Sequence, residues 1–265
     1  MNDLAPRAIA ALEHLVRELG SPGDLDLTVH ATRTGIKQLR AFVRLARRSI
    51  GTDAYRIEDG ALRSAARIIA PARDALVLIE TARSEHAAST VIGTLEREHA
   101  AALADLESGG RREAVGMLES TAIRWGRREW HGPPARSIRI GLRRTYRRAA
   151  ADLESAIADA ADAAFHGWRR RVKYVRYQLE GIGAPDTLVA PFTALGDDLG
   201  IEHDHSVLIG VCDARVTDPG FRDLALRSHR RRSELRARAV DVGSRLFASQ
   251  PSAFVADLER VVDLA

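Results

Sequence analysis

The stretch HATRTGIKQLRAFVRLARR, residues 30–48, has the pattern of one long amphipathic helix with a basic face. It contains no proline and one glycine, and its apolar residues recur with the 3,4 spacing of a buried helix face. That apolar face consists of Ile36, Leu39, Val43, Ala46 and Ile50. The stretch also holds six lysine and arginine side chains and no carboxylate, although the whole chain carries 36 acidic against 40 basic residues. The pattern therefore predicts a helix that buries one face and concentrates positive charge beside it.

The basic residues form a stripe of their own. They follow the same 3,4 spacing and lie about 100° around the helix from the apolar face. The stripe consists of His30, Arg33, Lys37, Arg40, Arg44 and Arg47. A solvated charged face is the common explanation of such a pattern, and it stays open here. Solvated faces usually mix signs, however, because like charges at i and i+4 oppose helix formation. A stripe of one sign favours a site for an anionic ligand.

Composition predicts an all-α protein. Helix-favouring residues dominate, aromatic residues make up 5% of the chain, and no stretch alternates as a strand does. The net charge of only +4 argues against a nonspecific polycation and suits a focused anion site. We expect a cytoplasmic protein that does not interact with membranes, because no apolar run could span a bilayer and the N-terminus lacks a signal-peptide pattern. Cys212 is the only cysteine, which excludes an intrachain disulfide and a thiolate metal cluster.

The basic stripe occurs twice in the chain. FHGWRRRVKYVRYQLEGI at 165–182 aligns with VHATRTGIKQLRAFVRLA at 29–46, and the shared pattern is H-x2-R-x3-K-x2-R. The alignment pairs His30 with His166, Arg33 with Arg169, Lys37 with Lys173, and Arg40 with Arg176, and the two paired lysines are the only lysines in the chain. Further along, Asp74 pairs with Asp204 and His99 with His229. A duplication of two halves, 1–130 and 135–265, is therefore predicted, with the boundary in EWHGPPARS at 129–137.

Several helices are expected in each half. Periodicity and breaker residues predict helices near 5–19, 25–50, 56–84, 87–107, 111–128, 136–161, 164–180, 187–199, 203–215, 219–248 and 252–263. Helices of this length with short connections favour one helical bundle per half, related by an approximate twofold axis.

These motifs resemble the CHAD family, the conserved histidine α-helical domain. The resemblance lies in the second stripe with Tyr177 and Glu180, in TYRR at 145–148, in LGDDLGIEHDHSVL at 195–208, and in the first-half VHATRTGIKQLR and ARDALVL. It implies one domain over 1–265 with two pseudo-symmetric helical bundles around a basic central cavity. It also implies binding of inorganic polyphosphate without catalysis. Gln38 departs from the pattern, because the family often has a base there.

The chemistry of the stripes agrees with a linear polyanion as ligand. A helix stripe offers a base about every 5 Å along its axis, and a guanidinium grips phosphate oxygens in a fork. The candidate polyphosphate-binding residues are His30, Arg33, Lys37, Arg40, Arg44, Arg63, Arg67, Arg139, Arg143, Arg147, His166, Arg169, Lys173, Arg176 and His229. We expect Asp74 and Asp204 to support them by holding a neighbouring arginine or histidine in place. The histidines are expected either to donate to phosphate when protonated or to act as neutral rings.

Three alternatives compete with polyphosphate binding. A hydrolytic metal site in EHDH, residues 202–205, is disfavoured because His203 and His205 face different sides of a helix. A nucleic-acid-binding protein is the stronger rival, since any phosphate backbone is drawn to such stripes. An adaptor that docks another protein on polyphosphate granules is the third. The prediction is a non-enzymatic polyphosphate-binding protein without cofactor or metal, associated with granules in cells that make them, whose protein partners the sequence does not identify.

Overall fold

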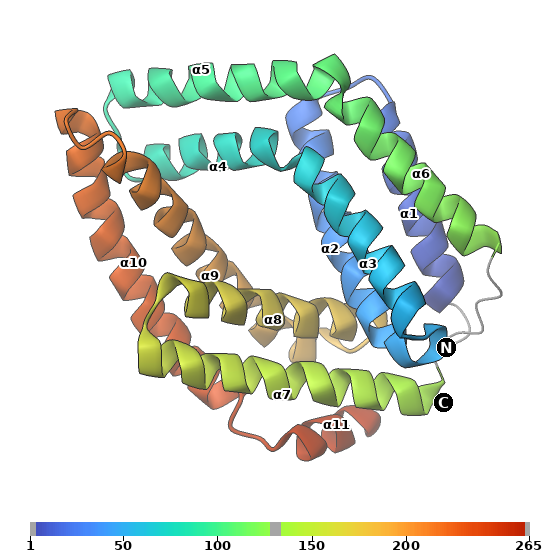
Figure 1. Cartoon of the computed structure of the whole chain (residues 1–265). Coiled ribbons are helices and arrows are strands. Elements are labelled where there is room, and N and C mark those ends of the chain that lie inside the picture. Colours follow the sequence, from blue (N-terminus) through green and yellow to red (C-terminus); the bar gives the residue numbers. More distant parts are fainter. Residues whose placement is uncertain (1–3, 128–133, 263–265) are drawn as a thin grey trace.

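The computed structural model of the protein describes residues 4–127 and 134–262, and helices are the only regular elements in this part of the chain (Figure 1). The helices are α1 (Leu4–Gly20), α2 (Leu25–Ile50), α3 (Thr52–Ile68), α4 (Ala70–Ser84), α5 (Ser89–Asp105), the π-helical turn η1 (Leu106–Gly110), α6 (Arg111–Arg127), α7 (Ala135–Asp159), α8 (Asp162–Gly181), α9 (Asp186–Asp213), α10 (Pro219–Leu246) and α11 (Pro251–Glu259). The prediction of an all-α protein is confirmed. In the described residues, no helix has the length and apolarity needed to cross a membrane.

Helices α1, α2, α3 and α6 pack together as an N-terminal bundle. The apolar stripe predicted for residues 30–48 lies inside it, with Ile36, Leu39 and Val43 buried among residues of the neighbouring helices. Leu12 of α1, Leu62 of α3 and Leu118 of α6 complete this core. Helix α2 is capped by Asp24, whose side chain accepts a hydrogen bond from the backbone N–H of Leu27. The core fixes the rotation of α2 and so sets the direction of its basic stripe.

Helices α7 to α11 form a C-terminal bundle around a second core, which also includes Leu4 of α1 and Leu45 of α2. Trp168 of α8 is fully buried in it, close to Gly243 of α10. A Cβ at Gly243 would lie only 2.4 Å from Cζ2 of Trp168, so the indole fits because this position has no side chain. Tyr146 of α7 lies in the same core, where its hydroxyl donates to the carbonyl of Leu246. This packing holds α8 in place along one side of the bundle.

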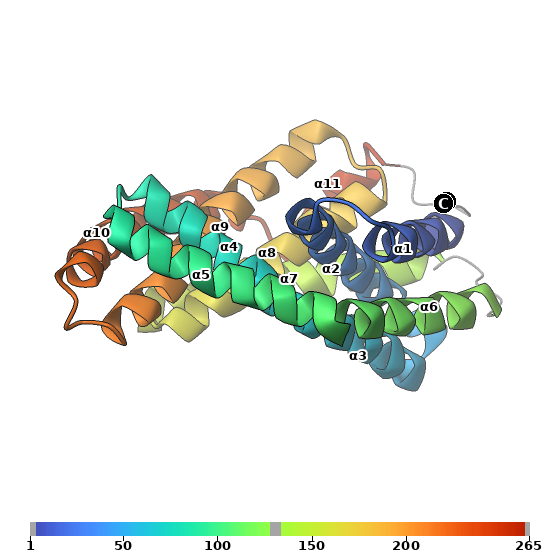
Figure 2. The same ribbon diagram turned by 90° about the horizontal axis from the view of Figure 1, so that it is seen from above.

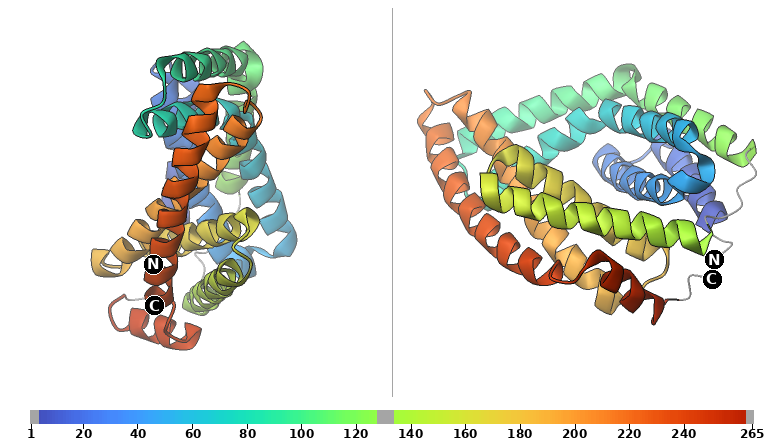
Figure 3. Two further views of the ribbon diagram at one scale, coloured as in Figure 1. Left: turned by 90° about the vertical axis from the view of Figure 1, so that its left-hand side faces the viewer. Right: turned by 60° about the horizontal axis from the view of Figure 1, so that its bottom comes forward.

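The hairpin of α4 and α5 connects the two bundles. It extends from the N-terminal bundle to α9 and α10, where Ile79 and Leu95 share a third core with Leu208, Phe221 and Leu224 (Figures 1 and 2). A second connection joins α2 to α8 through Ala41, Tyr174 and Tyr177. Helix α10 runs along one side, from the end near α5 to the end near α11 (Figure 3). The two connections leave α2, α4, α8 and α9 on four sides of a shared interior space.

Two helix predictions were wrong. The helix expected over 56–84 is interrupted at Ile69, where α3 ends and α4 begins, because Pro71 lacks the N–H and crowds the preceding turn. The two helices expected over 187–199 and 203–215 are one helix, α9. Its glycines Gly196 and Gly200 lie inside the helix on the side that packs on α8, where a Cβ at Gly196 would lie 3.6 Å from Cγ of Lys173. Most of the predicted boundary at 129–137, including Pro133, lies outside the described residues.

Candidate anion-binding cavity

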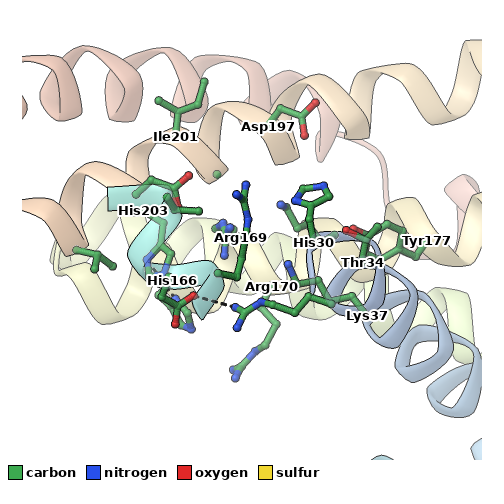
Figure 4. A pocket seen from close by; sticks show the side chains of 18 of the residues that line it. His30, Thr34, Lys37, His166, Arg169, Arg170, Tyr177, Asp197, Ile201 and His203 are labelled. Carbon is green, nitrogen blue, oxygen red and sulfur yellow. Dashed lines mark hydrogen bonds and ion pairs between the residues drawn. The ribbon is translucent and has the colours of Figure 1, made fainter. Parts of the chain in front are cut away.

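A cavity of about 560 Å³ lies between α2, α4, α8 and α9. Figure 4 shows side chains of His30, Arg169 and His203 around the same space, each from a different helix. The cavity is lined by His30, Arg33, Thr34, Lys37, Arg40, Arg73, Asp74, Val77, Leu78, His166, Arg169, Arg170, Lys173, Tyr174, Tyr177, Asp197, Gly200, Ile201, His203, Asp204 and Val207. Both long basic helices and both helices that carry the predicted supporting carboxylates therefore contribute to one site.

The two basic stripes meet in this cavity. Arg33 and Lys37 reach it from α2, and Arg169 and Lys173 reach it from α8. On each helix the neighbouring apolar residue is buried in its own bundle, Ile36 in one and Val172 in the other. Because side chains three and four residues apart share a helix face, burying one face turns the adjacent basic face toward the cavity. The structure thus brings together three of the four residue pairs of the basic stripes, and also Arg40 without its predicted mate.

Lys37, Lys173 and Arg169 form a half-buried cation cluster in the cavity, and none of them has an ion pair with a described carboxylate. Burial and the charge of Lys173 lower the pKa of Lys37 to about 7. Burial and the charge of Arg169 lower the pKa of Lys173 to about 8. The Nε of Arg169 is buried without a hydrogen-bond partner in the described part of the chain. The cluster therefore holds positive charge that is partly removed from water and has no direct ion pair with a described carboxylate.

Three carboxylates lie at the edge of this cluster. Asp74 of α4 forms an ion pair with Arg33, whose Nη2 lies 3.1 Å from the Asp74 Oδ1. Asp197 of α9 lies 3.6 Å from Nη1 of Arg176. Burial raises the pKa of Asp204, and the charge of Arg169 opposes that shift. Asp74 thus has the geometry of the supporting role predicted for it. Asp204 forms no direct ion pair with a described residue, and its interaction with the cations is a longer-range electrostatic one.

Two histidines meet at one end of the cavity. Nδ1 of His166 lies 3.4 Å from Nδ1 of His203, and the ring centroids are 4.6 Å apart. Burial, followed by the charge of Arg169, lowers the pKa of both, that of His203 to about 3. Burial and Arg73 also lower the pKa of His30. In the protein without ligand these rings are therefore mostly neutral at pH 7, and a neutral ring has one N–H donor and one acceptor nitrogen.

The two histidines of the EHDH segment lie on different sides of α9. His203 lines the cavity, whereas His205 is buried on another side of α9 with its Nε2 3.7 Å from Oε1 of Glu85. Glu202 is buried against Arg232 and Arg236. Within the residues that the structure describes, no three histidine, cysteine or acidic side chains are placed to hold a metal ion together. The different directions of His203 and His205 agree with the helix geometry expected from the sequence.

Some predicted binding residues already have a partner in the protein. Arg40 lines the cavity, but its Nε donates to Oδ1 of Asp59 at 2.9 Å. Arg176 forms a hydrogen bond with Glu180 at 2.7 Å, one turn further along α8. Arg139 of α7 is paired with Glu259 of α11 at 2.9 Å. For these three residues the guanidinium charge is at least partly neutralised by a carboxylate.

Other predicted residues lie outside the cavity. Arg44 belongs to a second, much smaller basic pocket, which is lined by Arg44, Arg47, Arg144, Thr145, Arg148 and Arg171. Its guanidinium lies over the ring of Tyr174, 4.5 Å from the centroid. Five further predicted residues are exposed and do not line the cavity, namely Arg63 and Arg67 of α3, Arg143 and Arg147 of α7, and His229 of α10. The structure thus places about half of the predicted set around one space and distributes the rest elsewhere.

Several lining residues were not predicted. Arg73 and His203 occupy matching positions, since the predicted alignment that pairs Asp74 with Asp204 also pairs their preceding residues. The alignment of the two halves could therefore have identified Arg73 and His203 as lining residues. Arg170, Thr34, Tyr174 and Tyr177 had no comparable signal, because their contribution depends on how α2 crosses α8.

Known proteins of one family are similar to this chain. The family model described as CHAD domain matches residues 6–213. Among solved structures, the chain is similar to the CHAD domain from the plant Ricinus communis, with 16% sequence identity and a TM-score of 0.60. The similarity covers 93% of this chain and 89% of the plant chain, and at this identity it concerns the fold alone. No curated protein matches the sequence.

Proposed function

This chain belongs to the CHAD domain family, and on that premise we propose that its basic cavity binds inorganic polyphosphate without converting it. The observation that carries the proposal is the cluster of Lys37, Lys173 and Arg169, which holds positive charge without a paired carboxylate among the described residues. Charges that are partly withdrawn from water gain free energy when a counter-ion reaches them. A bound polyanion would supply that counter-charge.

The distribution of charge favours a linear polyanion over a single phosphate. Donors recur along α2 and α8, so successive phosphate units can contact successive turns of each helix. Arginine offers a fork that matches two phosphate oxygens, whereas the two lysines act as compact charges between the arginines. Thr34 and the neutral histidines add uncharged donors to the same wall. Carboxylates at the edge, such as Asp74, hold Arg33 toward the ligand.

The absence of catalysis is part of the proposal. Hydrolysis of a phosphoanhydride commonly uses a metal ion that polarises the phosphoryl oxygens and activates water. In the described lining, Asp197 and Asp204 of α9 are separated by two helical turns, and Asp74 is engaged by Arg33. These acids do not converge on one point where a metal ion or a nucleophilic water would be held.

A binding titration with polyphosphates of defined length tests the proposed function. We expect long chains to bind more tightly than short ones at equal phosphate concentration, because a long chain contacts more of the cations that recur along α2 and α8. Arg169→Ala is expected to weaken binding at least tenfold, since it removes a cation without an ion pair to a described residue. Arg48→Ala is the matched control, because Arg48 is exposed on α2 and does not line the cavity. Equal losses in the two variants would refute a localised site.

Nucleic acid is the alternative ligand. Tyr174 and Tyr177 line the cavity, but both are buried and pack against Ala41, so their rings complete a helix contact and are not free to stack on bases. Competition separates the two ligands: long polyphosphate should displace a single-stranded oligonucleotide at matched phosphate concentration. Failure of this displacement would favour the nucleic-acid function. We further propose that polyphosphate binding directs the protein to polyphosphate granules in the cytoplasm, with or without a docked protein.

A further inference from the structure

We infer that Lys37 and Lys173 are acylation sites for small acyl phosphates, which dock in the cavity through their phosphate group. The inference rests on the proposed function, because it uses the same anion site. It adds a chemical reaction of the two lysines and a way to change the charge of the cavity.

The geometry places an amine beside an anion-binding group. A Cβ at Gly200 would lie 3.8 Å from Nζ of Lys173 and 4.0 Å from Nε of Arg169, so both nitrogens lie against the same position of α9. The Nε of Arg169 has no hydrogen-bond partner among the described residues and is therefore free to donate. In an acyl phosphate the acyl carbon is bonded directly to a phosphate oxygen. When Arg169 binds the phosphate group, this carbon therefore lies within reach of the neighbouring Lys173 amine.

Lys37 belongs to the same cluster and reaches it from α2, which crosses α8. The charges of Lys173 and Arg169 are the two that most lower its pKa after burial. Neither lysine has an ion pair with a described carboxylate that would hold it protonated. Each amine can therefore lose its proton without breaking a salt bridge to a described residue.

The protonation state of both lysines suits a nucleophile. An ordinary exposed lysine is unprotonated in about one molecule per thousand near pH 7.4. With pKa values lowered to about 7 and about 8, a large share of Lys37 and Lys173 carries a free lone pair at that pH. Lowered pKa values also reduce intrinsic nucleophilicity, but the gain in the unprotonated fraction is larger.

The reaction balances without any further reagent. The Nζ lone pair attacks the acyl carbon, the bond between that carbon and the phosphate oxygen breaks, and inorganic phosphate leaves with the electron pair. The amine proton passes to water, and an amide remains on the lysine. Cations around the phosphate stabilise the charge that develops on the leaving group.

Acylation would act on polyphosphate binding. An amide carries no charge, so each modification removes one of the cations of the cluster. Conversely, a bound polyphosphate occupies Arg169 and holds both lysines protonated, which protects them from acylation. The two ligands therefore exclude each other in this cavity.

The test uses the full chain and acetyl phosphate as the probe. Because Lys37 and Lys173 are the only lysines, intact mass and peptide mapping report on these two side chains and on the N-terminal amine separately. We expect both lysines to react about tenfold faster at pH 7.5 than in the same chain unfolded in urea. Inorganic phosphate and long polyphosphate should each slow the reaction. Lys37→Arg should leave one reactive side chain, and Lys173→Arg the other.

A neutral reagent separates anion docking from simple amine reactivity. Phenyl acetate acylates a free amine without using an anion site. In Arg169→Gln, the rate with acetyl phosphate should fall more than the rate with phenyl acetate. Protection of the wild-type protein by inorganic phosphate provides the same information if this variant does not fold.

The outcomes distinguish this inference from the proposed function. If polyphosphate binds but the lysines react no faster than in the unfolded chain, the acylation inference is wrong and polyphosphate binding stands. If the lysines react rapidly but polyphosphate neither binds nor protects them, the proposed function fails and the acyl phosphate site remains. Equal rates with and without inorganic phosphate would also overturn the inference.

Discussion

Lys37 of α2 and Lys173 of α8 line the same cavity from opposite halves of the chain, and the charge of Lys173 is the neighbouring charge that most lowers the pKa of Lys37. The predicted repeat pairs these two residues. Their convergence in space is what the alignment implies if each copy supplies one wall. The duplication itself remains a prediction.

The first prediction concerns these two lysines as separate contacts. At pH 6, where both are charged, Lys37→Ala and Lys173→Ala should each lower the slope of log affinity for long polyphosphate against log salt by about 0.7, by analogy with single-stranded nucleic acid. The double variant should lose about the sum. Titrations at several salt concentrations measure the slopes, and Arg48→Ala should leave the slope unchanged. If one lysine variant binds like wild type while the other loses nearly all affinity, a groove along a single helix replaces the shared cavity.

Periodicity predicted the part of the site formed by Arg33, Lys37 and their counterparts, because each of them lies beside a buried apolar residue of the same helix. It could not place Arg44, which continues the stripe of α2. The stripe passes the crossing with α8 at Ala41 and Tyr174, and beyond it Arg44 lies in a second basic pocket. Where two helices cross is a tertiary feature, and the spacing of residues along one helix carries no information about it.

Ion pairs between different helices could not be predicted from the sequence pattern either. The partner of Arg40 is Asp59 on α3, and the partner of Arg139 is Glu259 on α11. A stripe shows which cations share a face, but it does not show which of them meet a carboxylate of another helix. The continuous helix α9 was missed for a related reason, since its glycines contact α8 instead of ending the helix.

The second prediction compares two arginines of the same stripe. Arg40→Ala should lower the free energy of unfolding by about 2 kcal/mol, because it leaves Asp59, whose side chain is only 12% exposed, without its partner. Arg33→Ala should cost less than about 1 kcal/mol, because its partner Asp74 is 58% exposed. Urea denaturation of both variants measures the difference. A loss for Arg33→Ala as large as that for Arg40→Ala would contradict this account of the stripe.

The third prediction concerns pH. The folded protein without ligand has lysine pKa values lowered to about 7 and about 8, and a bound polyanion raises them again. Above pH 7 the lysines of the free protein lose their protons, and they must regain them when the polyanion binds. The affinity for polyphosphate should therefore fall between pH 7 and 9. Each lysine that is charged in the complex contributes up to about one log unit of affinity per pH unit.

The control for this pH dependence keeps the charge and removes the titration. In a variant with both Lys37→Arg and Lys173→Arg, the guanidinium groups stay protonated over this range, so the affinity should change little from pH 7 to 9. Calorimetry in two buffers of different ionisation enthalpy measures the proton uptake directly. An equally steep pH dependence in wild type and double variant would show that other groups cause it.

The fourth prediction concerns the space beside Gly200, which a side chain can fill without changing any charge. An added Cβ at this position of α9 meets Lys173 Nζ and Arg169 Nε at ordinary contact distances, so Gly200→Ala should fold, bind polyphosphate and gain up to about 1 kcal/mol from helix propensity. Gly200→Leu extends further into the space between these two cations. It should weaken binding at least tenfold, because the ligand phosphate and the leucine side chain compete for that space.

The matched control is Gly210→Leu on the same helix, because Gly210 is exposed and an added Cβ there meets nothing within 4 Å. It should leave polyphosphate affinity unchanged. Circular dichroism of the three variants verifies that α9 keeps its helical structure, and titration with long polyphosphate gives the affinities. Wild-type affinity in Gly200→Leu would place the ligand outside the cavity, on the exposed arginines of α3 or α7 or in the smaller basic pocket, since a chain that contacts Arg169 and Lys173 together must pass in front of Gly200.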